Sequence, residues 1–136
     1  MDEAAVWAIG VVGLLVLAAG AWTFMTGPNS PFAAKWREEA RELEVVIRMS
    51  HGTEMVDNLH RIARLYFKLG QRWDAEKSLQ RALQICRRES GEMSPALIPL
   101  LDEYIRLMKS THRKKEALTL EKEIERINAG NGAKSA

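Results

Sequence analysis

Few residues of this 136-residue chain have the type and spacing that catalysis needs. The chain has one cysteine, Cys86, and three histidines, at positions 51, 60 and 112. Asp57 and His60 lie one helical turn apart and can form a polar pair, but no nucleophile or third ligand accompanies them. A single cysteine excludes an internal disulfide and a cysteine-cluster zinc site. The sequence has no Gly-rich phosphate loop and no HExxH motif, so we expect no enzymatic activity, no metal and no cofactor.

Charge divides the chain into two parts. Residues 4–25 carry no charged side chain, and only Asp2 and Glu3 precede them. The remainder carries all twenty Lys and Arg residues and sixteen Asp and Glu residues, which leaves a net charge of +4. Because dedicated nucleic-acid-binding domains are usually strongly basic, this balance argues against a nucleic-acid partner.

The uncharged run predicts a transmembrane helix within residues 1–25. Its 22 residues span roughly 33 Å as a helix, enough for a hydrocarbon core of about 30 Å. Lys and Arg residues follow the run and none precedes it, which places the N-terminus outside and the C-terminal domain in the cytoplasm, or on the matrix side in an organelle. Gly13 and Gly20 share one helix face and are candidates for packing on another membrane helix. The alternatives are a signal peptide, although its basic n-region is missing, and a buried helix.

Helix-breaking and capping residues divide the rest of the chain. Residues 26–30 form a Gly/Pro linker. Ser30 followed by Pro31, and Ser94 followed by Pro95, are typical helix starts. We expect helices at 31–49, 54–69, 72–89, 95–110 and 113–128, and a disordered tail at 129–136.

A 42-residue period relates these helices to one another. Ala33, Ala75 and Ala117 lie 42 residues apart, and Arg64 and Arg106 are separated by the same interval. Other positions follow the same register: Ala40, Ala82 and Ile124; Leu43, Ile85 and Ile127; Ile62 and Tyr104; Ala63 and Ile105. A fixed period of this length indicates stacked helical hairpins, each covering the apolar side of the next.

The segment 59–85 resembles a tetratricopeptide repeat (TPR). The matching positions are Ile62, Ala63, Tyr66, Gly70, Ala75, Leu79 and Ala82. The 42-residue spacing is similar to the variant found in kinesin light chains. Together with the predicted transmembrane helix, the resemblance implies an all-α fold in which a single N-terminal transmembrane helix precedes a short TPR-like solenoid. Its parts are a half-unit at 31–49, a repeat at 54–89 and a degenerate repeat at 95–128.

The resemblance also implies that the first helix of each unit lines a protein-binding groove. The groove residues carried over by position are His60, Arg64, Phe67, Lys68, Asp102, Arg106 and Lys109. Arg64 and Arg106 would lie side by side and would suit an acidic segment or a terminal carboxylate. The other interpretation is that they are ordinary solvated charges.

These observations predict a membrane-anchored adaptor or scaffold that binds other proteins at the bilayer surface and aids their recruitment or assembly. The alternative is an accessory subunit of a larger membrane complex, energy-transducing or secretory, with the transmembrane helix as its main contact. The layout also resembles that of organelle preprotein receptors. Two and a half units leave an end of the solenoid open, so self-association is a further expectation.

Overall fold

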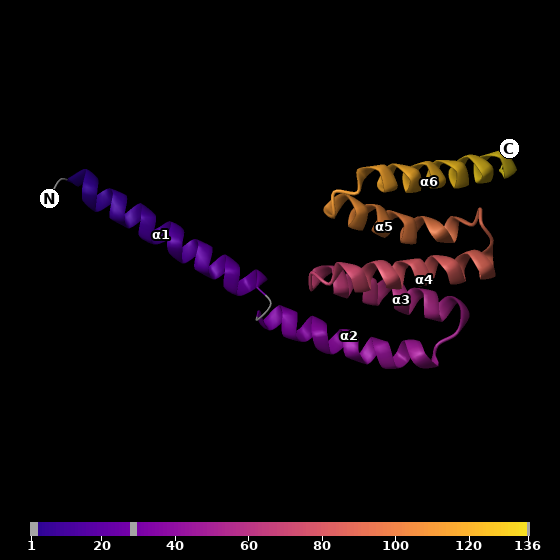
Figure 1. Cartoon of the computed structure of the whole chain (residues 1–136), viewed down its shortest axis with the longest axis horizontal. Helices are drawn as coiled ribbons and strands as arrows, with labels where there is room; N and C mark the ends of the chain where they lie inside the picture. The colour runs from indigo at the N-terminus through magenta and orange to yellow at the C-terminus, as the bar shows by residue number, and fades with distance from the viewer. Residues whose placement is uncertain (1–2, 28–29, 136) are drawn as a thin grey trace.

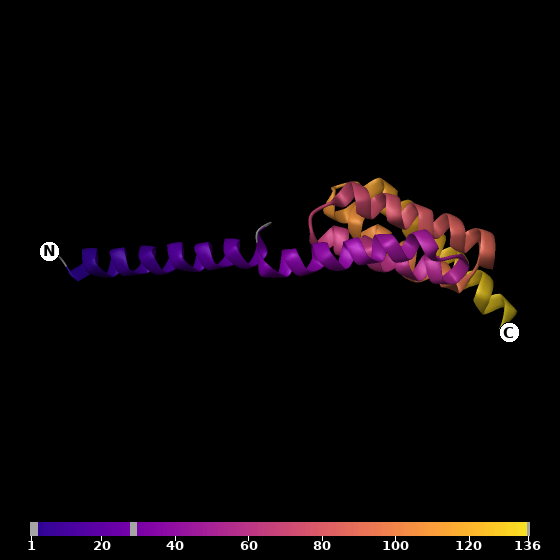
Figure 2. The same cartoon turned by 90° about the horizontal axis from the view of Figure 1, so that it is seen from below.

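The computed structural model describes residues 3–27 and 30–135, which form helices and turns. The helices are α1 (Glu3–Thr26), α2 (Pro31–Met49), α3 (Gly52–Lys68), α4 (Arg72–Ser90), the 3-10 turn η1 (Pro95–Leu97), α5 (Ile98–Ser110) and α6 (Lys114–Lys134). No strand occurs in the described part of the chain. Helices α2 to α6 stack as antiparallel layers, and α1 projects away from this body (Figure 1). Seen from below, α1 extends beyond one end of the body (Figure 2). The all-helical expectation is confirmed.

The predicted transmembrane helix is wrong. Among the residues that the structure describes, no helix has both the length and the apolar character that crossing a bilayer requires. The predicted single-pass topology, with the N-terminus outside and the body in the cytoplasm or matrix, depended on this helix and is wrong as well.

The turns between helices form as the sequence indicates. The Ser30 hydroxyl accepts a hydrogen bond from the Ala33 amide at 3.0 Å, so Ser30 is the N-cap of α2. Gly70 ends the α3 region with a φ of +75°, a conformation that favours glycine. Its 42-residue equivalent is His112, which has a φ of +61°. The backbone therefore repeats this turn even where glycine has been replaced.

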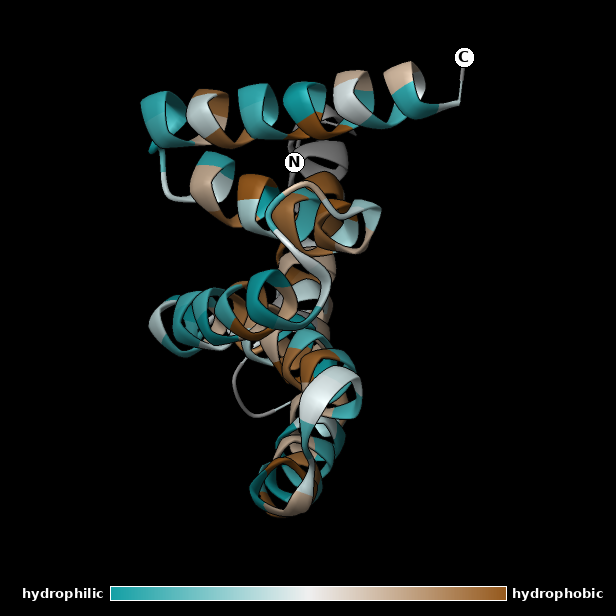
Figure 3. Ribbon diagram, turned by 90° about the vertical axis from the view of Figure 1, so that its right-hand side faces the viewer, coloured by the Kyte–Doolittle hydropathy of each residue, from teal (hydrophilic) through white to brown (hydrophobic). Residues whose placement is uncertain are grey.

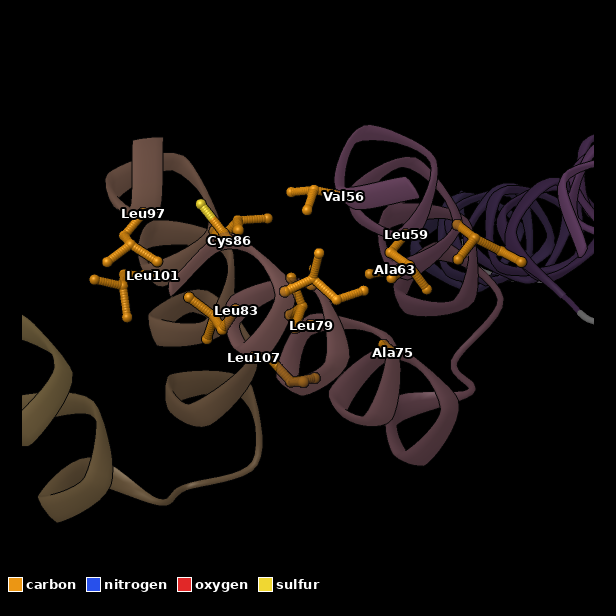
Figure 4. Packing of buried hydrophobic residues seen from close by; sticks show 14 of the residues in the cluster. Val56, Leu59, Ala63, Ala75, Leu79, Leu83, Cys86, Leu97, Leu101 and Leu107 are labelled. Atoms are coloured by element: carbon orange, nitrogen blue, oxygen red, sulfur yellow. The ribbon is translucent and has the colours of Figure 1, made fainter. Parts of the chain in front are cut away.

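The 42-residue period corresponds to buried packing positions. Ala33, Ala75 and Ala117 are all buried, as are Leu43, Ile85 and Ile127. Figure 4 shows the side chains of α3, α4 and α5 meeting in one cluster around Leu79, which is 1% exposed. Small residues at Ala63, Ala75 and Ala82 allow the helices to approach closely, and the larger aliphatic residues fill the space around them.

The C-terminal tail is more ordered than expected. Helix α6 continues to Lys134, so residues 129–134 are helical and not disordered. The Asn131 side-chain amide donates to the Ile127 carbonyl at 2.8 Å and to the Met93 carbonyl at 3.4 Å. Gly130 also faces Met93, because a Cβ at that glycine would lie 2.9 Å from the Met93 Cε. The tail thus packs on the loop that follows α4.

Polar side chains tie α4 to the two helices that follow it. The Arg113 guanidinium donates to both carboxylate oxygens of Glu76, at 2.9 and 2.8 Å. The Tyr104 hydroxyl donates to the same carboxylate at 2.9 Å. At the other end of α4, Arg87 forms an ion pair of 2.7 Å with Glu123. These contacts hold the two hairpins in one arrangement.

Candidate docking surfaces

The two arginines expected in the groove do lie together, but a carboxylate of this chain lies between them. Arg64 Nε is 3.4 Å from Glu103 Oε2, and Arg106 Nη1 is 3.9 Å from the same oxygen. The Glu103 side chain is only 13% exposed, whereas those of Arg64 and Arg106 are 57% and 72% exposed. Glu103 therefore partly neutralises the surface that was expected to receive an acidic segment.

His60 belongs to the same cluster. Its Nε2 lies 3.9 Å from Glu103 Oε2 and is buried without a hydrogen-bond partner among the described residues. Burial lowers the pKa of His60, and the charge of Arg64 lowers it further, while Glu103 acts in the opposite direction. His60 is thus a packed side chain between α3 and α5. The charge of Asp57 also acts to raise the pKa of His60, although the described residues show no ion pair between the two.

The other predicted groove residues separate into different places. Phe67 is half-buried against the core. Lys68 points toward α2, where its Nζ lies 5.4 Å from the centre of the Trp36 ring. Asp102 and Lys109 line a cleft between α5 and α6 together with Arg106. Arg106 thus belongs both to the Glu103 cluster and to this cleft, whereas Lys68 faces α2.

The α5–α6 cleft lies at the end of the helical stack. It has a volume of about 550 Å³, and its lining is Asp102, Ile105, Arg106, Lys109, Glu121, Ile124 and Glu125. Glu121 and Glu125 occupy the positions that Leu79 and Leu83 hold on α4. Lys109 and Glu121 close one side with an ion pair of 2.7 Å. Figure 3 shows α6, the helix that ends at C, with hydrophilic residues along its outer side. A polar outer face is typical of the terminal unit of a helical array.

Helix α1 carries more exposed large hydrophobic side chains than any other helix in the described part of the chain. Its aliphatic side chains are exposed in every direction: Val11, Val12, Leu14, Leu15, Val16 and Leu17 are 56% to 74% exposed. A Cβ at Gly13 or Gly20, the two glycines expected to pack on another helix, would meet nothing within 4 Å. The structure therefore does not pack the Cα of Gly13 against the body of its own chain.

A pocket at the junction between α1 and α2 was missed by the sequence analysis. It has a volume of about 330 Å³ and lies between this junction and the turn that joins α3 to α4. Its lining is Gly27, Ala33, Trp36, Arg37, Lys68, Leu69, Gly70 and Gln71. The adjacent Trp36 and Arg37 were the available sequence signal, but their proximity to Lys68 depends on the packing of α3 on α2.

The groups that could act in catalysis are dispersed. Cys86 is buried in the core, and burial raises the pKa of its thiol, which disfavours a reactive thiolate. Within residues 3–27 and 30–135, no group of three His, Cys, Asp or Glu side chains is arranged to hold a metal ion. The geometry offers surfaces and a pocket for binding.

Comparisons with known proteins add no relatives: no family model, no curated protein and no solved structure matches the chain. The resemblance to tetratricopeptide repeats therefore stays a prediction from the sequence.

Proposed function

We propose that this chain is a docking protein. In this proposal its body is a TPR-like scaffold of helical hairpins, and the protein holds another protein in place and aids recruitment or assembly. The observation that carries the proposal is α1, a helix of 24 residues whose described aliphatic side chains are exposed all round.

The physical argument is that such a helix needs a cover. A helix that is hydrophobic on all sides is stable in water only when other apolar groups surround it. Exposed apolar surfaces of this kind mark sites of interaction. The body does not supply the cover, because α1 projects away from it (Figure 1). We therefore propose that the apolar surface of a partner protein covers α1.

The body supports the same proposal through its rigidity. The ion pairs Arg113–Glu76 and Arg87–Glu123 join helices that are distant in sequence. Its surface is rich in charge, so it remains hydrated while α1 is covered. A rigid, hydrated body joined to an apolar helix brings a bound partner near the body and raises its effective concentration there.

A site-specific photo-crosslinker in the full chain tests the proposal in the native cell. Placed at Leu15, which is 63% exposed on α1, it is expected to form an adduct with one defined protein. Placed at Glu42, an exposed residue of α2, it serves as the matched control and is expected to form no such adduct. Adducts of Leu15 with lipid alone, or the same adducts from both positions, would contradict the proposal.

A further inference from the structure

We infer that the pocket at the α1–α2 junction binds a phosphate group through Arg37 and Lys68. The inference does not depend on what covers α1. Arg37 comes from the second turn of α2 and Lys68 from the last turn of α3, and both line the same pocket. None of its described lining residues is acidic.

The absence of an ion-pair partner among the described residues distinguishes these two side chains from the other cations near a cavity. Arg64, Arg106 and Lys109 each have a carboxylate of this chain within 4 Å. In contrast, neither Arg37 nor Lys68 has an ion pair within 4.0 Å in the part of the chain that the structure describes. Two uncompensated positive charges that line one pocket attract an anion, and the guanidinium group can donate two parallel hydrogen bonds to it.

The surrounding residues limit the freedom of this site. The Trp36 ring holds Lys68 Nζ at 5.4 Å from its centre, and Phe32 packs on Trp36 with 6.4 Å between ring centres. The turn at Gly70 is closed by its own hydrogen bonds, from the Gly70 amide to the Phe67 carbonyl and from the Gln71 amide to the Tyr66 carbonyl. The anion is therefore held by the two side chains and not by the amides of the turn.

The position of Arg37 in the repeat explains why this pocket exists. Arg37 is the 42-residue equivalent of Leu79, which α4 buries in the core. On α2 the same position is exposed, because α1 extends away instead of packing antiparallel on α2 (Figure 2). A cation thus occupies a place that a core leucine holds in the next unit. At about 330 Å³, the cavity is at the lower limit of ligand pockets, which suits a phosphate group with a small attachment.

Nuclear magnetic resonance of the indole N–H of Trp36 tests the site, because this ring contacts Lys68. The full chain is held in neutral dodecyl maltoside micelles, and the Trp36 signal is assigned with Trp36→Phe. One titration uses inorganic pyrophosphate, and another uses micelles doped with phosphatidylglycerol, with phosphatidylcholine as the neutral comparison. A saturable shift with pyrophosphate supports the site and identifies a soluble phosphate as the ligand. A shift with phosphatidylglycerol alone supports the site and identifies a lipid headgroup.

The variants decide whether the named side chains hold the anion. Arg37→Ala combined with Lys68→Ala is expected to weaken binding by about tenfold or more, as loss of two charge-assisted bonds requires. Both side chains are exposed, so the fold is expected to persist, and circular dichroism checks this. The control removes the same charges elsewhere, with Arg48→Ala and Lys122→Ala, and is expected to bind like the parent. No saturable shift with either probe, or an equal loss in the control, would overturn the inference.

Discussion

Truncation of Leu79 to alanine is expected to destabilise the body by about 3 kcal/mol. Leu79 is 1% exposed, at the centre of the cluster that joins α3, α4 and α5 (Figure 4). Leu79→Ala removes three carbons, which is about 2.4 kcal/mol of transfer free energy at about 0.8 kcal/mol per methylene. The cavity left behind adds about 1 kcal/mol, because the small neighbours Ala63 and Ala75 cannot fill it.

Urea unfolding of the full chain, followed by circular dichroism at the helix band, measures this loss. The midpoint is expected to fall while the slope stays the same, because the surface exposed on unfolding changes little. In a thermal scan the midpoint is expected to fall by about 4–8 °C for each kcal/mol. Leu118→Ala is the matched control, since Leu118 is 52% exposed on α6 and its truncation is expected to cost less than about 1 kcal/mol. Equal destabilisation by the two substitutions would refute the packing argument.

Three further predictions concern titration and backbone strain. Because burial lowers the pKa of His60, the unfolded chain takes up a proton at this residue before the folded chain does, and the free energy of unfolding is expected to fall as the pH drops below about 6.5. In thermal scans His60→Gln is expected to remove this dependence, whereas the control His51→Gln is expected to retain it. Burial, and then Glu44, raise the pKa of Tyr66, so the unfolded chain loses the phenol proton before the folded chain does, and the free energy of unfolding is expected to fall above about pH 10. Tyr66→Phe is expected to reduce the slope of the urea midpoint against pH, and an unchanged slope would contradict the role of Tyr66. His112→Gly is expected to stabilise the chain by about 1 kcal/mol in urea unfolding and Gly70→Ala to destabilise it by a similar amount, since both positions have a positive φ; opposite signs would count against the strain.

Local signals in the sequence predicted most of the helical architecture. The N-caps at Ser30 and Ser94 and the turn at Gly70 depend on neighbouring residues alone, so single-sequence reasoning places them correctly. The 42-residue period was equally accessible, because close helix packing requires a small residue at the same place in each unit, as at Ala75 and Ala117.

The ion pairs on the surface could not be predicted from the sequence in the same way. Glu103 neutralises Arg64 across 39 positions of sequence, and nothing local to either residue predicts their contact. The prediction of a disordered tail differs from the structure for a similar reason. The small polar residues of the tail predict disorder, but the Asn131 side chain donates a hydrogen bond to the Met93 carbonyl. Where the partner of a side chain comes from a distant helix, the outcome depends on tertiary packing that composition does not encode.

Only part of the candidate site could therefore be predicted from the sequence. The repeat correctly brought Arg64 and Arg106 together, because equivalent residues of stacked units are neighbours. It could not show that Lys68 turns toward Trp36 on another helix. The membrane-spanning helix was inferred from the length and composition of an apolar run, and the structure gives no such span in the part that it describes.

The charged residues of the α5–α6 cleft affect where a further helical unit could pack on the stack. A duplicated 42-residue segment inserted ahead of α5 would meet the apolar surface around Leu79 and Leu83 on one side. The same segment appended behind α6 would meet Glu121 and Glu125 in those positions and would have to desolvate two carboxylates. Extension of the stack behind α6 therefore carries a desolvation cost that an insertion ahead of α5 does not.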